Sequence, residues 1–315
     1  MSDPAARTRR GIRLPFGARR GAGAPRGAAR QRTGASRVAW LGMVPFLAFV
    51  ALFLGGPLYV VIHGAFTTDS NRFTLSNFSE IFSQPVYTIA LKNSAILALW
   101  TSVGPAIFGL WIAAAVVAGN PGSLLRRVIS SASGVLAYFA GAPLAFVWIA
   151  TVGNLGVVTV LLKNVLNFNL AQHFNIASIS GVGIAYFYFQ IPLMVIFITP
   201  ALEGMRPEWE EAATNLGASR LSYLRLVVMP ILAPSVIGAT LMLFGSAFAA
   251  YATALALQGG TLDIIPGRIN LALSNNVLPG QDRIAMALGA EMIVVVMVVM
   301  LGYWLVQRRA GMWLR

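Results

Sequence analysis

Cysteine is absent from this chain of 315 residues, and charged residues are scarce. Without cysteine there are no disulfides, no thiol chemistry and no zinc sites with thiolate ligands. Charged residues make up 10% of the chain, against the roughly 25% that is usual in soluble domains. Since 57% of the residues are hydrophobic, the composition predicts an integral membrane protein.

Side chains suited to catalysis and metal binding are also few. The two histidines, His63 and His173, stand far apart in the sequence and predict no metal site. Both lysines, Lys92 and Lys163, are followed by asparagine, so the phosphate-binding pattern Gly-x4-Gly-Lys-Ser/Thr is missing. We therefore expect no catalytic residues, no cofactor in this chain and no hydrolysis of ATP by it.

The hydrophobic residues gather in long blocks. A helix needs about 20 predominantly apolar residues to cross the hydrocarbon core of a bilayer. These blocks predict an all-α integral membrane fold with about six transmembrane helices, and Val157–Phe168 predicts a short helix at the membrane interface. The six blocks are Trp40–Ile62, Tyr87–Ala118, Val128–Ala150, Ile176–Ala201, Met229–Leu257 and Ile284–Val306.

Lysine and arginine are unevenly distributed between alternate loops. If the N-terminus is cytoplasmic, the inner segments hold 18 of the 23 basic residues and the outer segments hold five. Cytoplasmic loops of membrane proteins are enriched in Lys and Arg. We therefore predict that both termini are cytoplasmic.

The first 38 positions hold ten of the basic residues and are otherwise rich in Gly, Ala and Pro. We expect residues 1–38 to be a disordered basic tail near anionic lipid. Nucleic-acid binding is not expected, because Phe16 is the one aromatic residue among these arginines. An organelle transit peptide is disfavoured by the Gly and Pro content. Residues 39–307 are the predicted transmembrane domain, and residues 308–315 are a predicted cytoplasmic C-terminal tail.

One inner loop, residues 203–230, differs chemically from the rest of the chain, since it holds four of the ten acidic residues. Pro207 suits the first position of a helix, and the glutamates after it suit the positive end of the helix dipole. Gly217 suits the position just past the end. We predict a helix of about ten residues, followed by a second helix capped by Ser219. An idle solvated helix and a helix that inserts into another protein's groove both fit this pattern.

The same loop resembles the EAA loop of ABC-importer permeases. In that family, Glu-Ala-Ala is followed by three residues, Gly, nine residues, an aliphatic residue, one residue and Leu-Pro. Here Val replaces the usual Ile and Met replaces Leu, and the loop lies between the fourth and fifth predicted spans, where the family places it. In this chain the pattern is Glu211-Ala212-Ala213, Gly217, Val227 and Met229-Pro230.

The resemblance implies an ABC-importer type I-like permease bundle in a bacterial plasma membrane. Its EAA helix would dock a separate cytoplasmic ATPase, on which ATP and Mg²⁺ would act. The expected partners are two nucleotide-binding ATPase subunits, a second permease subunit (a paralogue rather than a copy), an extracytoplasmic solute-binding protein and the lipid bilayer. The expected coupling residues are Glu210, Glu211, Ala212, Ala213, Leu216 and Gly217.

Short patterns indicate the solute class. Sugar-type permeases often have Asp before the motif glycine, whereas this chain has Leu216. The chain resembles instead the branch that carries polyamines, iron and phosphonates, and Phe73–Phe78, Leu91–Ser94 and Gln258–Gly260 are similar to polyamine-type permeases. We expect a small charged solute such as a polyamine. A sugar-type importer is the alternative, and a stand-alone secondary transporter is a less favoured one.

Glu291 is the ionisable residue that lies most clearly inside a predicted span, where an uncompensated charge is costly. It indicates either a site for a cationic solute or a protonated or paired carboxylate that joins two helices. Gln190 either lines the same solute pathway or hydrogen-bonds a neighbouring helix, and the second interpretation is favoured. The aromatic run Tyr186–Phe189 is expected to pack between helices.

Overall fold

The computed structural model describes residues 35–120, 122–258, 263–274 and 280–313. The expected disordered tail lies outside the described residues as far as residue 34, and its last four positions, 35–38, are helical rather than disordered. The expected all-α fold is confirmed, because six segments are long and apolar enough to cross a membrane. These segments are Gly42–Ala65, Pro85–Ala118, Ala142–Leu166, Ile179–Glu203, Arg220–Ala249 and Gln281–Arg308.

The chain divides into two compact units after Gly56. In its described part, the first unit consists of α1 (Ala35–Val50) and the π-helical turn η1 (Ala51–Gly55). The second unit begins at Pro57, within α2 (Gly56–Ala65), and contains every later helix. All of the candidate site residues belong to the second unit.

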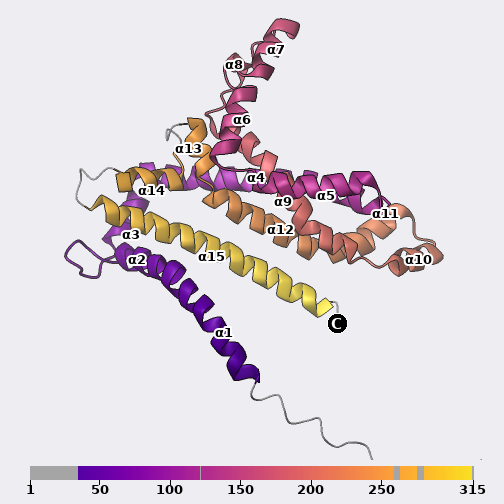
Figure 1. Ribbon diagram of the computed structural model, residues 1–315, viewed down its shortest axis with the longest axis horizontal. Helices are drawn as coiled ribbons and strands as arrows, with labels where there is room; N and C mark the ends of the chain where they lie inside the picture. Colours follow the sequence, from indigo (N-terminus) through magenta and orange to yellow (C-terminus); the bar gives the residue numbers. More distant parts are fainter. Residues whose placement is uncertain (1–34, 121, 259–262, 275–279, 314–315) are drawn as a thin grey trace, which may run out of the picture. The chain divides into compact units, whose positions relative to one another are not determined.

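Four long helices form the centre of the second unit. They are α4 (Pro85–Ala118), α9 (Ile179–Glu203), α12 (Met229–Ala249) and α15 (Gln281–Trp313). α4 packs against α9 and α12, and α12 packs against α15, so the helices lie side by side (Figure 1). Their sequences are apolar around the whole circumference, which is typical of helices that contact either protein or lipid on every side.

Short helices occupy the two ends of this bundle (Figure 1). At one end, α3 (Ser76–Ser83) packs on α15, and α14 (Ile265–Ser274) packs on α15 and α4. At the other end lie α10 (Pro207–Asn215), α11 (Arg220–Tyr223) and the π-helical turn η2 (Leu224–Val228). The segments that contain α3 and α14 thus lie at the opposite end from the segment that contains α10 (Figure 1). The cytoplasmic location of the end with α10 stays a prediction.

The predicted third span, Val128–Ala150, is wrong as a continuous helix. The chain forms α5 (Leu124–Tyr138) and α6 (Ala142–Val152), with a break between them at Gly141. Gly141 has φ 76° and ψ −148°, a conformation that is essentially restricted to glycine. Pro143 then prevents the backbone hydrogen bond that would continue the helix across the break. The apolar segment of membrane length is instead Ala142–Leu166.

Beyond this break, α6 is followed by α7 (Val157–Leu166) and α8 (Leu170–His173). The helix predicted within Val157–Phe168 is therefore present, while its location at the membrane interface stays a prediction. The predicted fifth span ends earlier than expected, at Ala249, because Ala250 is extended before α13 (Ala252–Gln258) begins. The last helix continues past the expected Val306 to Trp313.

Glycines allow α4 and α9 to approach closely, as small residues do in membrane helix pairs. The Trp100 ring covers Gly183, and the Phe187 ring covers Gly104. A Cβ atom on Gly109 would lie 2.5 Å from Met194 Cβ and 2.9 Å from the backbone oxygen of Ile191. A larger residue at position 109 therefore forces the two backbones apart.

We predict that Gly109→Ala destabilises the protein by about 1–3 kcal/mol, because the added methyl group overpacks a rigid helix interface. Gly134→Ala in α5 is the matched control, since nothing lies within 4 Å of a Cβ atom there. The control is expected to leave the melting temperature unchanged or to raise it, because Ala favours a helix over Gly by up to about 1 kcal/mol. Thermal unfolding in detergent measures both, and equal melting temperatures would contradict the close approach.

Candidate functional site

The loop between α9 and α12 forms the short helix that the sequence predicts. α10 begins at Pro207, and Glu208 and Glu210 lie in its first turn, where the helix dipole favours negative charge. Gly217 ends the helix with φ 76°. The Ala218 N–H donates to the Ala213 oxygen at 3.0 Å and the Gly217 N–H donates to the Thr214 oxygen at 2.9 Å. These two bonds form a Schellman motif, which fixes the direction in which the chain leaves α10.

The chain then enters the bundle without a long linker. Ser219 Oγ accepts a hydrogen bond from the Ser222 N–H at 3.2 Å and caps α11, as the sequence predicts. From Arg220 the helical segment continues through η2 and α12 to Ala249. α10 is therefore joined by the short turn at Gly217 and Ala218 to a rod that spans the bundle.

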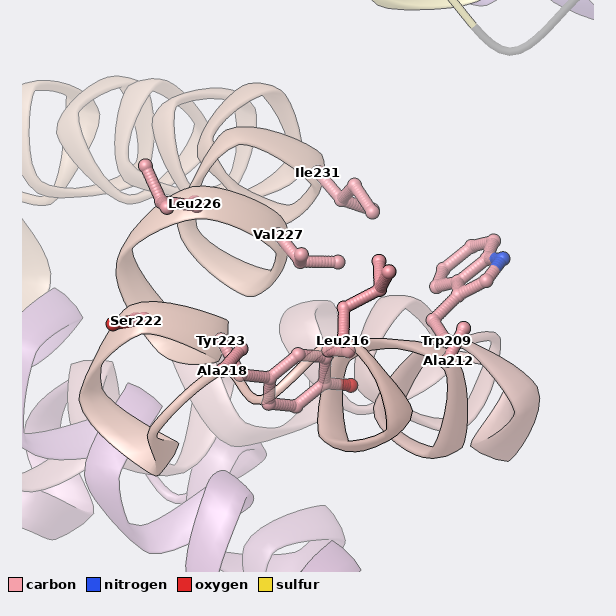
Figure 2. A pocket seen from close by; sticks show the side chains of 10 residues that line it. Trp209, Ala212, Leu216, Ala218, Ser222, Tyr223, Leu226, Val227 and Ile231 are labelled. Atoms are coloured by element: carbon pink, nitrogen blue, oxygen red, sulfur yellow. The ribbon is translucent and has the colours of Figure 1, made fainter.

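An open apolar groove lies between α10 and this rod. It has a volume of about 440 Å³. In Figure 2, Trp209 of α10 and Leu216 directly after α10 point toward the same space as Val227 and Ile231. The residues that line the groove are Trp209, Ala212, Ala213, Leu216, Ala218, Ser222, Tyr223, Leu226, Val227 and Ile231.

The expected coupling residues divide into two sets. Ala212, Ala213 and Leu216 line the groove, and Leu216 has 87% of its surface exposed. Glu210 and Glu211 are exposed but do not line it. Gly217 contributes its backbone conformation. Together with Trp209, the three lining residues form a contiguous apolar surface on a short polar helix, and contiguous apolar surface indicates a contact site where a single exposed leucine would not.

The start of the loop is tied to a neighbouring helix. The Arg126 guanidinium of α5 forms an ion pair with the Glu203 carboxylate at the end of α9. The Arg126 side chain is 21% exposed and the Glu203 side chain 46%, so the pair contributes little to stability on its own. Its effect is positional, because it holds the last turn of α9 next to α5 where the chain turns toward α10.

Sequence reasoning assigned no role to six of the groove residues, namely Trp209, Ala218, Ser222, Tyr223, Leu226 and Ile231. Trp209 shares one face of α10 with Ala212, Ala213 and Leu216, at the spacing i, i+3, i+4, i+7 that places residues on one side of a helix. This spacing could have identified Trp209. No comparable signal exists for Tyr223 and Ile231, because their place in the groove depends on how the chain folds back on α10.

The two candidate solute-path residues are buried but do not contact each other. Glu291 in α15 is 8% exposed, and its Oε2 atom has no hydrogen-bond partner. Gln190 in α9 is fully buried, and its Nε2 donates to Thr101 Oγ1 of α4 at 3.5 Å. Gln190 thus makes the contact to a neighbouring helix that the sequence favours. A role for either residue in a solute path stays a prediction.

The aromatic run in α9 packs between helices. Tyr186 and Phe189 lie in the core, Phe187 contacts Trp100 of α4 with ring centroids 5.1 Å apart, and the Tyr188 ring meets Phe139 edge-on at 6.3 Å. Among the residues that the structure describes, no three His, Asp or Glu side chains are grouped in a way that could hold a metal ion.

No family model matches the chain, but individual proteins are similar to it. The sulfate transport system permease protein CysT of Salmonella typhimurium is 25% identical over 217 residues, which are 68% of this chain and 72% of that protein. The spermidine/putrescine transport system permease protein PotC of Haemophilus influenzae is 28% identical over 102 residues, 32% of this chain and 40% of that protein.

Solved structures extend the similarity to the fold. The bacterial alginate ABC transporter, crystallised with an alginate pentasaccharide-bound periplasmic protein, contains a chain that matches with a TM-score of 0.67. The match covers 87% of this chain and 95% of that chain at 15% sequence identity, so it concerns the fold alone. By its sequence relatives this chain is a homologue of the permeases of ABC transporters, and by its architecture it has the fold of an ABC importer permease.

Proposed function

We propose that this chain forms the solute pathway of an ATP-driven, binding-protein-dependent importer and that residues 203–230 dock the ATPase. The groove on α10 carries this proposal. It is apolar, it is open, and it lies on a short helix that also carries Glu208, Glu210 and Glu211 outside the groove. Such a surface suits the insertion of an apolar side chain from a partner protein, with the acidic residues of α10 contributing to a polar rim.

The connection from α10 to the bundle gives the docking a mechanical effect. A displacement of α10 passes through the Schellman turn at Gly217 to the helical rod Arg220–Ala249. ATP binding and hydrolysis, with Mg²⁺, take place on the partner ATPase. The movement of α12 against α4, α9 and α15 then alternates access to the solute pathway from the two sides of the membrane.

The remaining partners follow from the same assignment. Two ATPase subunits act on two permease subunits, and a paralogue of this chain is the proposed second permease. An extracytoplasmic solute-binding protein delivers the solute, in line with the periplasmic protein of the alginate transporter. The proposed orientation places α10 and both termini in the cytoplasm, with the basic segment before α1 as a tail near the inner leaflet.

We predict that Leu216→Ala weakens binding of the ATPase subunit about tenfold or more, because burying a leucine side chain contributes about 1.5–3 kcal/mol. Leu155→Ala is the matched control, since Leu155 is 91% exposed and lies between α6 and α7. Titration of the permease complex with the purified ATPase in lipid nanodiscs measures both dissociation constants.

Solute-stimulated ATP hydrolysis gives a second readout of the same variants. It is expected to fall with Leu216→Ala and to stay at the wild-type rate with Leu155→Ala. If both variants bind the ATPase as tightly as the wild type, the groove does not form the docking surface.

For the solute, we propose a small charged compound, and a polyamine is the candidate that Glu291 favours. The named relatives transport chemically different solutes, since sulfate is an anion and spermidine and putrescine are cations. A buried carboxylate with an unpaired oxygen suits a cation. A sugar-type importer is the alternative proposal, and a secondary transporter would take up its solute along an ion gradient without an ATPase.

We predict that Glu291→Gln lowers uptake of radiolabelled spermidine about tenfold, since it removes one ionic contact worth about 1–2 kcal/mol. The same change is expected to raise the melting temperature, because a carboxylate without a partner is costly inside the bundle. Asp282→Asn, an exposed carboxylate near the start of the same helix, is the control for the loss of charge. Unchanged uptake with a lower melting temperature would instead assign Glu291 to helix packing, and sulfate uptake tests the anionic class directly.

A further inference from the structure

Two helix breaks lie beside each other in the second unit. The first separates α5 from α6 at residues 139–141, where Phe139 has φ −83° and ψ 77° and Gly141 has φ 76°. The second separates α12 from α13 at Ala250 and Tyr251. α6 packs directly against α13, so the segments that follow the two breaks belong to one packed layer.

A single side chain of α13, shortly after the second break, is bonded to the first break. Thr253 Oγ1 accepts a hydrogen bond from the Gly141 N–H at 2.9 Å and lies 3.2 Å from the Gly141 oxygen, to which it donates. Thr253 is 3% exposed, so water does not replace these bonds. The Gly141 oxygen also accepts from the Ala145 N–H at 3.2 Å, which begins α6. The hydroxyl of Thr253 therefore contacts both polar groups of the residue at which α6 starts.

Helix α9 supports the same region from a third side. The Tyr186 hydroxyl donates to the Ala250 oxygen at 2.8 Å, and the Tyr186 side chain is fully buried. Tyr188, two residues later, meets Phe139 of the other break. Backbone groups freed by a helix break inside a membrane protein are tolerated only where the protein or enclosed water satisfies them. Here Thr253 forms hydrogen bonds with the freed backbone groups of Gly141, and Tyr186 forms one with the oxygen of Ala250.

The position of Thr253 in the chain matters for function. The helical rod that starts at Arg220, next to the apolar groove, ends at Ala249, immediately before the second break. The first break, in contrast, is the point at which α6 and α7 leave α5. Thr253 belongs to α13, which follows the second break, and its hydroxyl is hydrogen-bonded to the Gly141 backbone in the first break.

We propose that Thr253 is a positioning residue whose hydroxyl links the two helix breaks, so that movement of α12 is transmitted to α6 and α7. The proposal rests on the proposed function, in which the ATPase moves α12 through α10. In this arrangement α6 changes position during the transport cycle. It moves together with α13 because Gly141 stays bonded to Thr253 while α12 is displaced.

The test compares Thr253→Val, which keeps the shape and removes the hydroxyl, with Thr253→Ser, which keeps the hydroxyl. Because the chain has no cysteine, spin labels can be attached at single introduced cysteines once the partner subunits' thiols have been removed. One labelled pair joins Leu99 of α4 to Phe146 of α6, and the other joins Leu99 to Ile237 of α12. All three side chains are exposed.

In the wild-type complex, ATP and Mg²⁺ are expected to change both label distances. In Thr253→Val, the Leu99–Ile237 distance still changes and the Leu99–Phe146 distance does not, while Thr253→Ser restores both. Solute uptake is expected to fall about tenfold or more in Thr253→Val with hydrolysis within about twofold of wild type, because valine removes both buried hydrogen bonds to Gly141 and thereby affects transmission rather than docking.

The outcomes separate the two proposals. An ATP response of the Leu99–Phe146 distance in Thr253→Val equal to that of the wild type would overturn the role of Thr253. The absence of any response at Ile237 in the wild type would overturn the proposed function itself. If Thr253→Val does not assemble, Thr253→Ala removes the hydroxyl without placing a branched methyl against Gly141. The Leu99–Phe146 and Leu99–Ile237 label distances are then measured in Thr253→Ala and read in the same way.

Discussion

Hydrogen bonding of the backbone is the constraint on which the rest of this structure depends. In lipid, N–H and C=O groups have no water to bond, so a spanning segment is stable only as a helix or beside other protein groups. The long helices α4, α9 and α15 satisfy most of the rule internally, although Pro105 in α4 and Pro192 and Pro200 in α9 each remove one backbone donor. The breaks around Gly141 and Ala250 satisfy it through Thr253 and Tyr186. The breaks in the long helices are therefore also the places where side chains of neighbouring helices form hydrogen bonds to the backbone.

The number of spans and the α10 helix were accessible from the sequence because both depend on local chemistry. Block length indicates a span, and Pro207 and Gly217 bound a helix whatever surrounds it. The break at Gly141 was not predicted, because an apolar run hides a change of direction within it. Pro143 beside a glycine was the available signal. The early end of the fifth span at Ala249 carried no such signal, since Ala250 and Tyr251 suit a helix as well as a turn.

The candidate site was predictable in part for the same reason. Ala212, Ala213 and Leu216 follow from the motif, and the position of Trp209 follows from helical spacing. The far wall of the groove, with Tyr223 and Ile231, requires knowledge of how tightly the chain turns after Leu216, and the Schellman bonds that set this turn are tertiary detail. The burial of Glu291 was expected from its place in a span, whereas its unpaired oxygen is visible only in the packed bundle.

If the open groove on α10 docks the ATPase as proposed, it also has a consequence for how the cell must produce this subunit. A permease chain that reaches the membrane before its ATPase carries a tryptophan, a leucine and two alanines on a surface that faces water. Such a surface attracts chaperones and proteases as readily as it attracts its intended partner. Balanced synthesis of the subunits, and rapid removal of any permease left over, is thus a requirement that the proposed docking surface would impose.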